Sequence, residues 1–428
     1  MYQSLNICCN VSVETTDHCN QRCHYCNQTN KIHSMHGAGR KNEFMDPALF
    51  RLILERMSAG RPTFESFTPY WGGEPLLHPQ TAEFLRSLFD TNRRTPFFKR
   101  FHMNTNAFYL TEEVSNILLD YAQYIEEQDA EEGQMYLTFS LDSVNPQTYA
   151  RIRGVPESQC VTALENVNRF LRLRAQRGLR RHFLIYQFVV CEENINELQD
   201  FLRYWKTRLT DLGVPHMVMT KQDRFFNDRD VIFIRQQDTG VFDTSMRFKL
   251  LHEQVVASLE PSDRPVIDAS VITANTSAVG TDTPATNVIT TAVSQTDWLK
   301  AKKPCAQLFN MLILSKDGTV VPCCKDLFFE LKLGNIKDNS FEEMWLGEQL
   351  KHLRLEQVEG HFARHTICAN CVNPPGGELS LTEVAEYLQD VGRLDLLGDY
   401  VSRHYGSPAT SRNAQTQPSV APISTQGS

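Results

Sequence analysis

Short apolar runs alternate with amphipathic helical patterns over the first half of the chain. Runs typical of strands occur at residues 7–14, 64–70, 100–104, 135–141, 183–190 and 215–220. Apolar residues recur at helical spacing over residues 47–58, 79–92, 111–126, 159–176 and 195–212. This alternation predicts an α/β fold whose sheet is mostly parallel. About six strand–helix units are too few for a closed eight-fold barrel, so we expect a partial (β/α)6 barrel with its chemistry at the carboxyl ends of the strands.

The alternation of strand and helix ends near residue 222, which bounds the predicted barrel at residues 1–222. Residues 223–303 are expected to form an irregular insertion or linker, because much of this segment is rich in Ser, Thr, Ala and Val. Residues 304–377 form a small cysteine-bearing unit, with a hairpin predicted at Asp317-Gly318. A helix is expected over residues 378–404 and a disordered tail over residues 405–428.

Composition narrows the class of protein. The 428 residues are 41% hydrophobic and 22% charged, which is typical of a folded globular chain. The net charge of −8 argues against nucleic acid as the main partner. No segment reads as a secretory signal or a membrane span, so the 12 cysteines indicate metal or redox chemistry in a cytoplasmic protein.

The first cysteine motif follows the first predicted strand. Cys19, Cys23 and Cys26 have the spacing C-x3-C-x2-C, and no fourth cysteine is near. Three thiolates can hold three corners of a [4Fe–4S] cluster and leave one iron open to another ligand. The alternative is a zinc knuckle with His18 or His24 as the fourth ligand.

Polar or glycine-rich motifs follow the next predicted strands. They contain Gly72, Gly73 and Glu74, then Asn104 and Asn106, then Ser140 and Arg153, and finally Asn194. Paired glycines let the backbone approach a ligand closely, and the planar guanidinium of arginine suits a carboxylate. An asparagine such as Asn194 is also a common helix cap.

This series of motifs resembles the radical S-adenosylmethionine (radical SAM) superfamily over residues 5–222. The resemblance implies that the three cysteines ligate a [4Fe–4S] cluster whose open iron binds SAM. Reductive cleavage of SAM would then give a 5′-deoxyadenosyl radical that abstracts hydrogen from a substrate carbon.

The resemblance also assigns SAM contacts to individual residues. Gly72, Gly73 and Glu74 would receive the amino group, and Ser140 and Arg153 the carboxylate. Tyr25, Asn104, Asn106 and Asn194 would lie near the rest of the cofactor. Relatives carry glycine where this chain has Ala107.

A second cysteine set resembles the auxiliary-cluster domain of the SPASM and Twitch families. Its members are Cys305, Cys323, Cys368 and Cys371. Four well-placed cysteines fit the smaller Twitch form, which implies one auxiliary [4Fe–4S] cluster with no open iron. Such a cluster would relay or accept electrons.

Two alternatives remain open for this second set. Cys324 could replace Cys323 as a ligand. A local zinc site could instead use His361, His365, Cys368 and Cys371, whose spacing is compatible with zinc.

Most remaining cysteines are expected to be small buried apolar residues. Cys191 differs, because it is predicted at the barrel mouth, where a thiol could return a hydrogen atom to a substrate radical. No other catalytic residue can be named. Tyr70, His102, Gln187 and Lys221 are candidate substrate contacts that the sequence does not rank.

The resemblance favours an oxidative step, such as dehydrogenation, on a small molecule like a sugar or aminocyclitol. A flavodoxin or ferredoxin would supply single electrons. One alternative is a radical SAM maturase or epimerase acting on a ribosomal peptide, although the chain begins almost directly at the first strand. A second alternative is a non-catalytic zinc or iron–sulfur scaffold.

Overall fold

The computed structural model describes residues 10–26, 42–59, 63–128, 133–180, 183–220, 228–237, 242–260, 263, 294–372 and 377–405. Its strands are β1 (Asn10–Val13), β2 (Phe64–Thr68), β3 (Phe98–Thr105), β4 (Gln134–Ser140), β5 (Phe183–Val189), β6 (His216–Met219), β7 (Asp230–Arg235), β8 (Met311–Leu314), β9 (Thr319–Val321) and β10 (Gly334–Asn335). The helices of the first half are α2 (Pro47–Ala59), α3 (Thr81–Arg94), α4 (Glu112–Glu127), α5 (Pro146–Arg153), α6 (Glu157–Gln176) and α7 (Leu198–Asp211). Those of the second half are α8 (Phe242–Ala257), α10 (Gln295–Ala301), α11 (Gln307–Asn310), α12 (Phe341–Leu346), α13 (Glu348–Val358), α14 (Thr366–Ala369), α15 (Leu381–Asp390) and α16 (Leu397–Tyr405).

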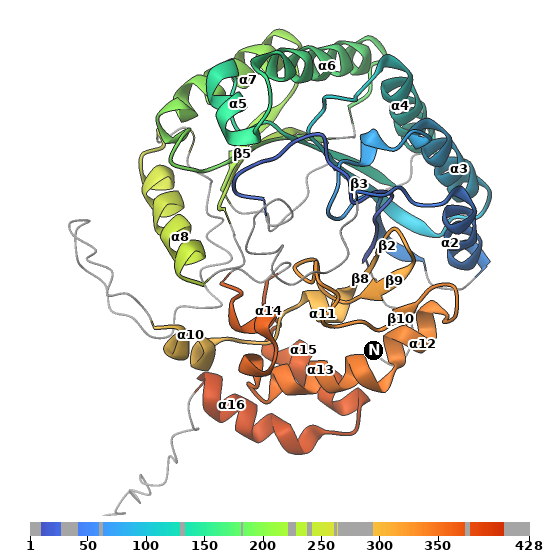
Figure 1. The fold of residues 1–428 in the computed structure, drawn as a ribbon, viewed down its shortest axis with the longest axis vertical. Helices are drawn as coiled ribbons and strands as arrows, with labels where there is room; N and C mark the ends of the chain where they lie inside the picture. The colour runs from blue at the N-terminus through green and yellow to red at the C-terminus, as the bar shows by residue number, and fades with distance from the viewer. Residues whose placement is uncertain are drawn as a thin grey trace, which may run out of the picture.

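All ten strands belong to one open sheet in the order β10-β9-β8-β1-β2-β3-β4-β5-β7-β6. Every neighbouring pair from β8 to β6 is parallel, and only β8–β9 and β9–β10 are antiparallel. Helices α2 to α7 follow the outer side of the curved sheet (Figure 1). The expected α/β fold with a partial, open barrel is therefore confirmed.

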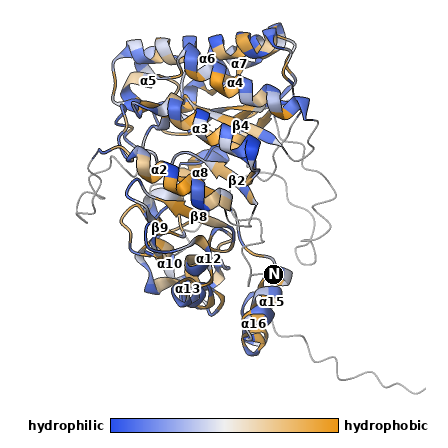
Figure 2. Cartoon of the chain, turned by 90° about the vertical axis from the view of Figure 1, so that its right-hand side faces the viewer, coloured by the Kyte–Doolittle hydropathy of each residue, from blue (hydrophilic) through white to orange (hydrophobic). Residues whose placement is uncertain are grey.

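The two faces of the sheet have different side chains, because successive strand residues point to opposite sides. Leu137 and Phe139 of β4 belong to the main core beneath the outer helices. Tyr136, on the other face, packs with Ile185 and Phe233 in a smaller interior cluster. Figure 2 shows polar and apolar residues alternating along the outer helices, as expected for helices that cover a sheet on one side.

The expectation of an irregular segment over residues 223–303 is wrong where the structure describes it. This stretch contains β7, α8 and α10, and β7 lies between β5 and the expected sixth strand, β6. The side chain of Asp230 explains this order, because it accepts hydrogen bonds from Arg174 on α6 and from Leu184 and Tyr186 on β5. Much of the Ser/Thr-rich part, and Lys221, lie outside the described residues.

The C-terminal unit continues the barrel sheet. The predicted hairpin is confirmed as β8 and β9, with Gly318 at the turn in the left-handed region (φ 89°). Strand β8 pairs in parallel with β1, and Phe341 of α12 packs edge-on against Phe64 of β2 with ring centroids 5.4 Å apart. The two cysteine-bearing parts of the chain therefore share one sheet and one core.

The single helix expected over residues 378–404 is wrong: α15 and α16 are separated by a turn that contains Gly392 (φ 70°). Helices α12, α13, α15 and α16 lie together on the side of the molecule opposite α6 (Figure 1). The expected disordered tail lies outside the described residues from residue 406 onward. Within the described part of the chain, no helix has the length and apolarity to cross a membrane.

Candidate active site

The first cysteine loop leaves β1 and brings its three thiols into mutual electrostatic contact. Cys23 is buried, and Cys19 and Cys26 are partly buried. Burial is the main cause that raises the pKa of Cys19 to about 12, and Glu74, Cys23 and Cys26 raise it further. Buried thiols that oppose each other's ionisation in this way suit a metal group, because a bound cation stabilises the thiolates.

Gly73 holds this loop against the segment that follows β2. A Cβ atom at Gly73 would lie 2.3 Å from Thr16 O and 2.7 Å from His18 O, so only glycine fits there. The next residue adds a hydrogen bond, from Glu74 N to His18 O at 2.9 Å. Gly72 N also donates to Glu14 Oε1 at 2.9 Å. The glycine pair thus lies directly beside the cysteine loop.

The Glu74 carboxylate is buried, and its oxygen atoms accept hydrogen bonds from other residues of the protein. It accepts hydrogen bonds from Thr105 Oγ1 at 2.6 Å and from Asn106 N at 2.8 Å, at the end of β3. Asn106 Nδ2 in turn donates to Asn20 Oδ1 at 2.8 Å, within the cysteine loop. Ala107, where the family resemblance leads us to expect glycine, has φ 62°, in the left-handed region that favours glycine.

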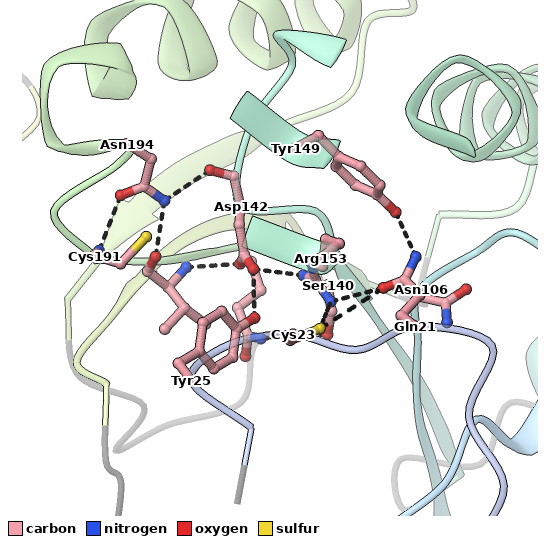
Figure 3. A network of polar contacts seen from close by, with 12 residues as sticks. Gln21, Cys23, Tyr25, Asn106, Ser140, Asp142, Tyr149, Arg153, Cys191 and Asn194 are labelled. Carbon is pink, nitrogen blue, oxygen red and sulfur yellow. Dashed lines mark hydrogen bonds and ion pairs between the residues drawn. The ribbon is translucent and has the colours of Figure 1, made fainter. Parts of the chain in front are cut away.

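Arg153, Asp142 and Tyr25 form a buried polar network beside Cys23 (Figure 3). Arg153 Nη2 lies 2.7 Å from Asp142 Oδ2, and the two side chains are 5% and 0% exposed. Arg153 Nη1 is 3.6 Å from Cys23 Sγ and 3.3 Å from Gln21 Oε1, and the Tyr25 hydroxyl donates to Asp142. Arg153 Nε is buried and has no hydrogen-bond partner among the described residues, so one donor of the guanidinium is left for a ligand.

Asn194 occupies the N-cap position of the short 3-10 helix Ile195–Glu197, but its side chain makes no capping hydrogen bond there. Its side chain donates to Asp142 O and Val189 O, both at 2.9 Å, and accepts from Cys191 N at 2.9 Å. Asn194 is fully buried, and its hydrogen bonds join the ends of β4 and β5 next to Asp142 (Figure 3).

Cys191 lies just past the carboxyl end of β5, where it was expected, and it is fully buried. Its thiol groups with His24 and Glu193, whose ligand atoms and Cys191 Sγ all lie within 4.8 Å of one another. The His24 and Glu193 side chains are 3.3 Å apart. Cys191 therefore contacts the cysteine loop from the β5 side.

A row of polar side chains crosses the interior face at the carboxyl ends of β4, β5 and β7. Gln187 Nε2 donates to Ser140 Oγ at 3.3 Å, and Arg235 Nη1 donates to Gln187 Oε1 at 3.1 Å. On β3, His102 lies 3.2 Å from Thr138 Oγ1, measured from Nε2. Sequence reasoning missed Arg235 because it missed β7. The only sequence pattern that could have predicted β7 was the alternation of Val231, Phe233 and Arg235.

Two more residues lie on the interior face near β2 and β3. Tyr70, after β2, packs edge-on against His102 with ring centroids 6.1 Å apart. Asn104 lies beside His102, and its side chain hydrogen-bonds the imidazole.

The second cysteine set also assembles in space. Cys305, Cys323, Cys368 and Cys371 are each buried, with 7–8% exposure. Burial is the main cause that raises the pKa of Cys305 to about 12, and the Cys371, Cys368 and Cys324 thiols raise it further. Gln357 links two members, since it accepts from Cys305 N at 2.8 Å and donates to Cys368 Sγ at 3.3 Å.

Cys324 lies between this set and the barrel. Its thiol donates to Gln307 Oε1 at 3.4 Å, and its carbonyl accepts from Trp71 Nε1 at 2.7 Å. Trp71 directly precedes Gly72, so the segment beside the first cysteine loop also contacts the residue next to Cys323.

The zinc alternatives require ligand atoms that lie close together. Ligands around one tetrahedral zinc lie within about 4 Å of one another. Among the described residues, no three thiols of either set meet even a 4.8 Å limit, which only His24, Cys191 and Glu193 satisfy. His365 instead lies 2.7 Å from Glu356, and His361 lies 3.2 Å from Glu359. Both histidines of the zinc alternative at the second set are therefore paired with carboxylates.

Comparison with known proteins agrees with these two sites. The model of the radical SAM superfamily matches residues 13–204, and that of the SPASM iron–sulfur cluster-binding domain matches residues 305–372. S-adenosyl-L-methionine-dependent 2-deoxy-scyllo-inosamine dehydrogenase of Niallia circulans is 28% identical over 74 residues, which are 17% of this chain and 30% of that protein. A GTP 3′,8-cyclase of Vibrio cholerae serotype O1 is 24% identical over 233 residues, or 54% of this chain and 59% of the cyclase.

The chain therefore spans less than two thirds of either curated relative. Among solved structures, native anSMEcpe with bound AdoMet (SAM) has a TM-score of 0.50 at 14% identity, covering 91% of this chain and 99% of that one. This likeness concerns the fold.

Proposed function

Because the chain belongs to the radical SAM superfamily and carries a C-terminal SPASM domain, we propose that it abstracts hydrogen from a carbon of a small molecule in an oxidative step. The cofactors of this family are SAM, the [4Fe–4S] cluster that binds it, and auxiliary iron–sulfur chemistry in the SPASM domain. When bound, they supply a 5′-deoxyadenosyl radical and an acceptor for the electron that remains on the substrate.

In this proposal, the cysteines divide between the two cofactor sites. Cys19, Cys23 and Cys26 hold the SAM-binding cluster. Cys305, Cys323, Cys368 and Cys371 hold the auxiliary cluster. All described cysteines are free thiols, which suits the reducing cytoplasm that we propose as the compartment.

One observation carries the proposal of an oxidative step. The Trp71–Cys324 hydrogen bond links the residue before Gly72 to the residue after Cys323, and the polar row from Ser140 to Arg235 lies at the carboxyl ends of the strands. A substrate on this row would be near both sites. It could lose a hydrogen atom toward SAM and one electron toward the auxiliary cluster, while a proton leaves to solvent or a base.

The proposed SAM contacts follow from the same geometry. The backbone of Gly72, Gly73 and Glu74 would face the amino group, since the Glu74 carboxylate is used elsewhere. Arg153, through its unpartnered Nε, and Ser140 would face the carboxylate. The remaining contacts would come from Tyr25, Asn104 and Asn106, while Asn194 would act only by bracing Asp142.

Dehydrogenation of a sugar or aminocyclitol is the reaction that we propose first. The local match to a SAM-dependent dehydrogenase supports it, over 17% of this chain. Each SAM cleaved takes one electron, which a flavodoxin or ferredoxin would deliver. The substrate gives up two electrons in total, one within the hydrogen atom and one to the auxiliary cluster.

Anaerobic reconstitution followed by dithionite and SAM tests the proposal. We expect about eight irons per chain, from two four-iron clusters, and formation of 5′-deoxyadenosine. Deuterated sugars and aminocyclitols should then transfer label to 5′-deoxyadenosine, and a carbonyl product should appear in equal amount.

The triple variant Cys19→Ala/Cys23→Ala/Cys26→Ala is the matched control. It should keep the auxiliary iron and form no 5′-deoxyadenosine. A wild-type protein that binds zinc in place of iron, or that makes no 5′-deoxyadenosine, would contradict the radical SAM mechanism. Deuterium transferred to 5′-deoxyadenosine only from a labelled peptide would show that the substrate is a peptide and not a small molecule.

A further inference from the structure

Arg235 is a cation on the interior face of the barrel that the cofactor sites do not use. Val231 and Phe233 of β7 belong to the interior cluster, so alternation places Arg235 on the same face, at the carboxyl end of the strand. The side chain is exposed there, and its hydrogen bond joins it to Gln187 on β5.

Within the described part of the chain, Arg235 forms no ion pair. Two carboxylates near the strand ends already have partners: Asp142 pairs with Arg153, and Glu74 accepts from Thr105 and Asn106. The partner of Arg235, Gln187, is a neutral amide. An arginine with free donors and no counter-charge is well suited to bind a planar or tetrahedral oxyanion.

The groups around Arg235 are neutral and polar. Burial is the main cause that lowers the pKa of His102 to about 4, and the Arg235 charge lowers it further, so His102 is neutral at pH 7. The charge of Arg235 also acts on the Tyr70 hydroxyl and on the Cys324 thiol. Arg235 therefore lies close to residues that flank both cysteine sites.

A second unsatisfied group follows on the same strand end. Gln237 is 3% exposed, and its Oε1 has no hydrogen-bond partner among the described residues. A buried acceptor without a donor costs stability unless a ligand or water supplies one. The end of β7 therefore offers both a cation and an acceptor.

We propose that Arg235 binds an oxyanion of the substrate, either a carboxylate or a phosphate, and that Gln187 orients the guanidinium for it. That the ligand is the substrate rests on the proposed function; that an oxyanion binds at Arg235 does not. The substrate is then an anionic small molecule, such as a phosphorylated or carboxylated sugar, held at the ends of β5 and β7.

Nuclear magnetic relaxation of two small anions tests this site directly. Inorganic phosphate and ¹³C-carboxyl acetate are each added to the reconstituted, dithionite-reduced protein, whose clusters are paramagnetic. An anion bound at Arg235 should relax faster, because the guanidinium lies close enough to Cys324, the neighbour of Cys323, to affect its pKa. We expect saturable relaxation of one anion, and at least about a tenfold loss of its affinity in Arg235→Gln.

Two variants serve as controls. Arg203→Gln removes an exposed arginine of α7 that pairs with Asp200, and it should bind the anion like the wild type. Arg235→Lys keeps the positive charge but lacks the planar guanidinium, which can donate two parallel hydrogen bonds, and it should show intermediate affinity. Equal iron content and circular dichroism spectra confirm that all variants are folded.

The outcomes are distinct. A phosphate-selective effect identifies a phosphorylated substrate, and an acetate-selective effect identifies a carboxylate. No saturable effect in the wild type, or the same effect in Arg235→Gln, overturns the proposal. If the anion binds through Arg235 but 5′-deoxyadenosine never forms, the proposed function fails and the anion site stands. If 5′-deoxyadenosine forms but no anion binds through Arg235, the anion site fails and the proposed function stands.

Discussion

Arg174 of α6 and Asp230 at the start of β7 form a buried, two-point ion pair. Nη1 and Nη2 of the arginine each lie 2.8 Å from one carboxylate oxygen, and the side chains are 5% and 2% exposed. Leu184 N and the Tyr186 hydroxyl, both on β5, also donate to this carboxylate at 3.1 and 2.9 Å. The carboxylate thus fixes β7 beside β5, and with it the position of Arg235.

Replacing Asp230 with Asn should lower the free energy of unfolding by about 3–5 kcal/mol, because the Arg174 charge would be left buried without a partner. Asp200→Asn breaks the exposed Arg203–Asp200 pair and should cost less than about 1 kcal/mol. Anaerobic urea unfolding of both variants measures the difference. Equal losses would show that the buried pair does not anchor β7.

Gly73→Ala should disturb the first cysteine loop, since the new Cβ would lie 2.3 Å from Thr16 O. We expect a loss of about 1–3 kcal/mol in unfolding free energy and poor iron uptake at the first site. Gly398→Ala is the control: no atom lies within 4 Å of its Cβ, and alanine favours helix α16. Normal iron content in Gly73→Ala would contradict this prediction, because it would show that the cysteine loop can shift and still bind iron.

Cys323 and Cys324 should differ in iron binding. Cys323 is buried, and the Cys305 and Cys368 thiols act on its ionisation, whereas the Cys324 thiol donates to Gln307. Cys323→Ala should therefore retain about four irons per chain after reconstitution, and Cys324→Ala about eight. Iron assays and electron paramagnetic resonance of the reduced proteins give the counts, and the opposite result would make Cys324 the ligand.

His102 should make stability depend on pH in the acid range. Burial lowers its folded pKa to about 4, below the value of 6.5 in the unfolded chain. The unfolded chain therefore binds a proton first, and stability that is complete above pH 6.5 falls as the pH drops toward 4. Between pH 7 and pH 5 the wild type should lose about 1–2 kcal/mol more than His102→Gln.

Urea unfolding at the two pH values measures this difference. His352→Gln, at a mostly exposed histidine of α13, controls for loss of an imidazole and should keep the wild-type dependence. If His102→Gln and the wild type lose stability equally, protonation of His102 does not contribute.

Features carried by residues close together in the chain were predictable from the sequence. The spacing of Cys19, Cys23 and Cys26 indicated an iron–sulfur site, and Asp317-Gly318 indicated the β8–β9 hairpin. Strand and helix periodicity gave the α/β class, because each element's pattern depends on its own residues. The family followed from these motifs in order.

What only the tertiary structure decided depends on residues far apart in the chain. The order β5-β7-β6 requires Arg174 and Asp230, 56 positions apart, and the contact between the segment after β2 and the residue after Cys323 requires Trp71 and Cys324, 253 positions apart. No local pattern encodes such pairs, since they form only when burial brings their partners together. The sequence by itself therefore determined the two cysteine motifs and the chemistry that they indicate, and only the folded sheet decided that Arg235 lies on the interior face of the barrel.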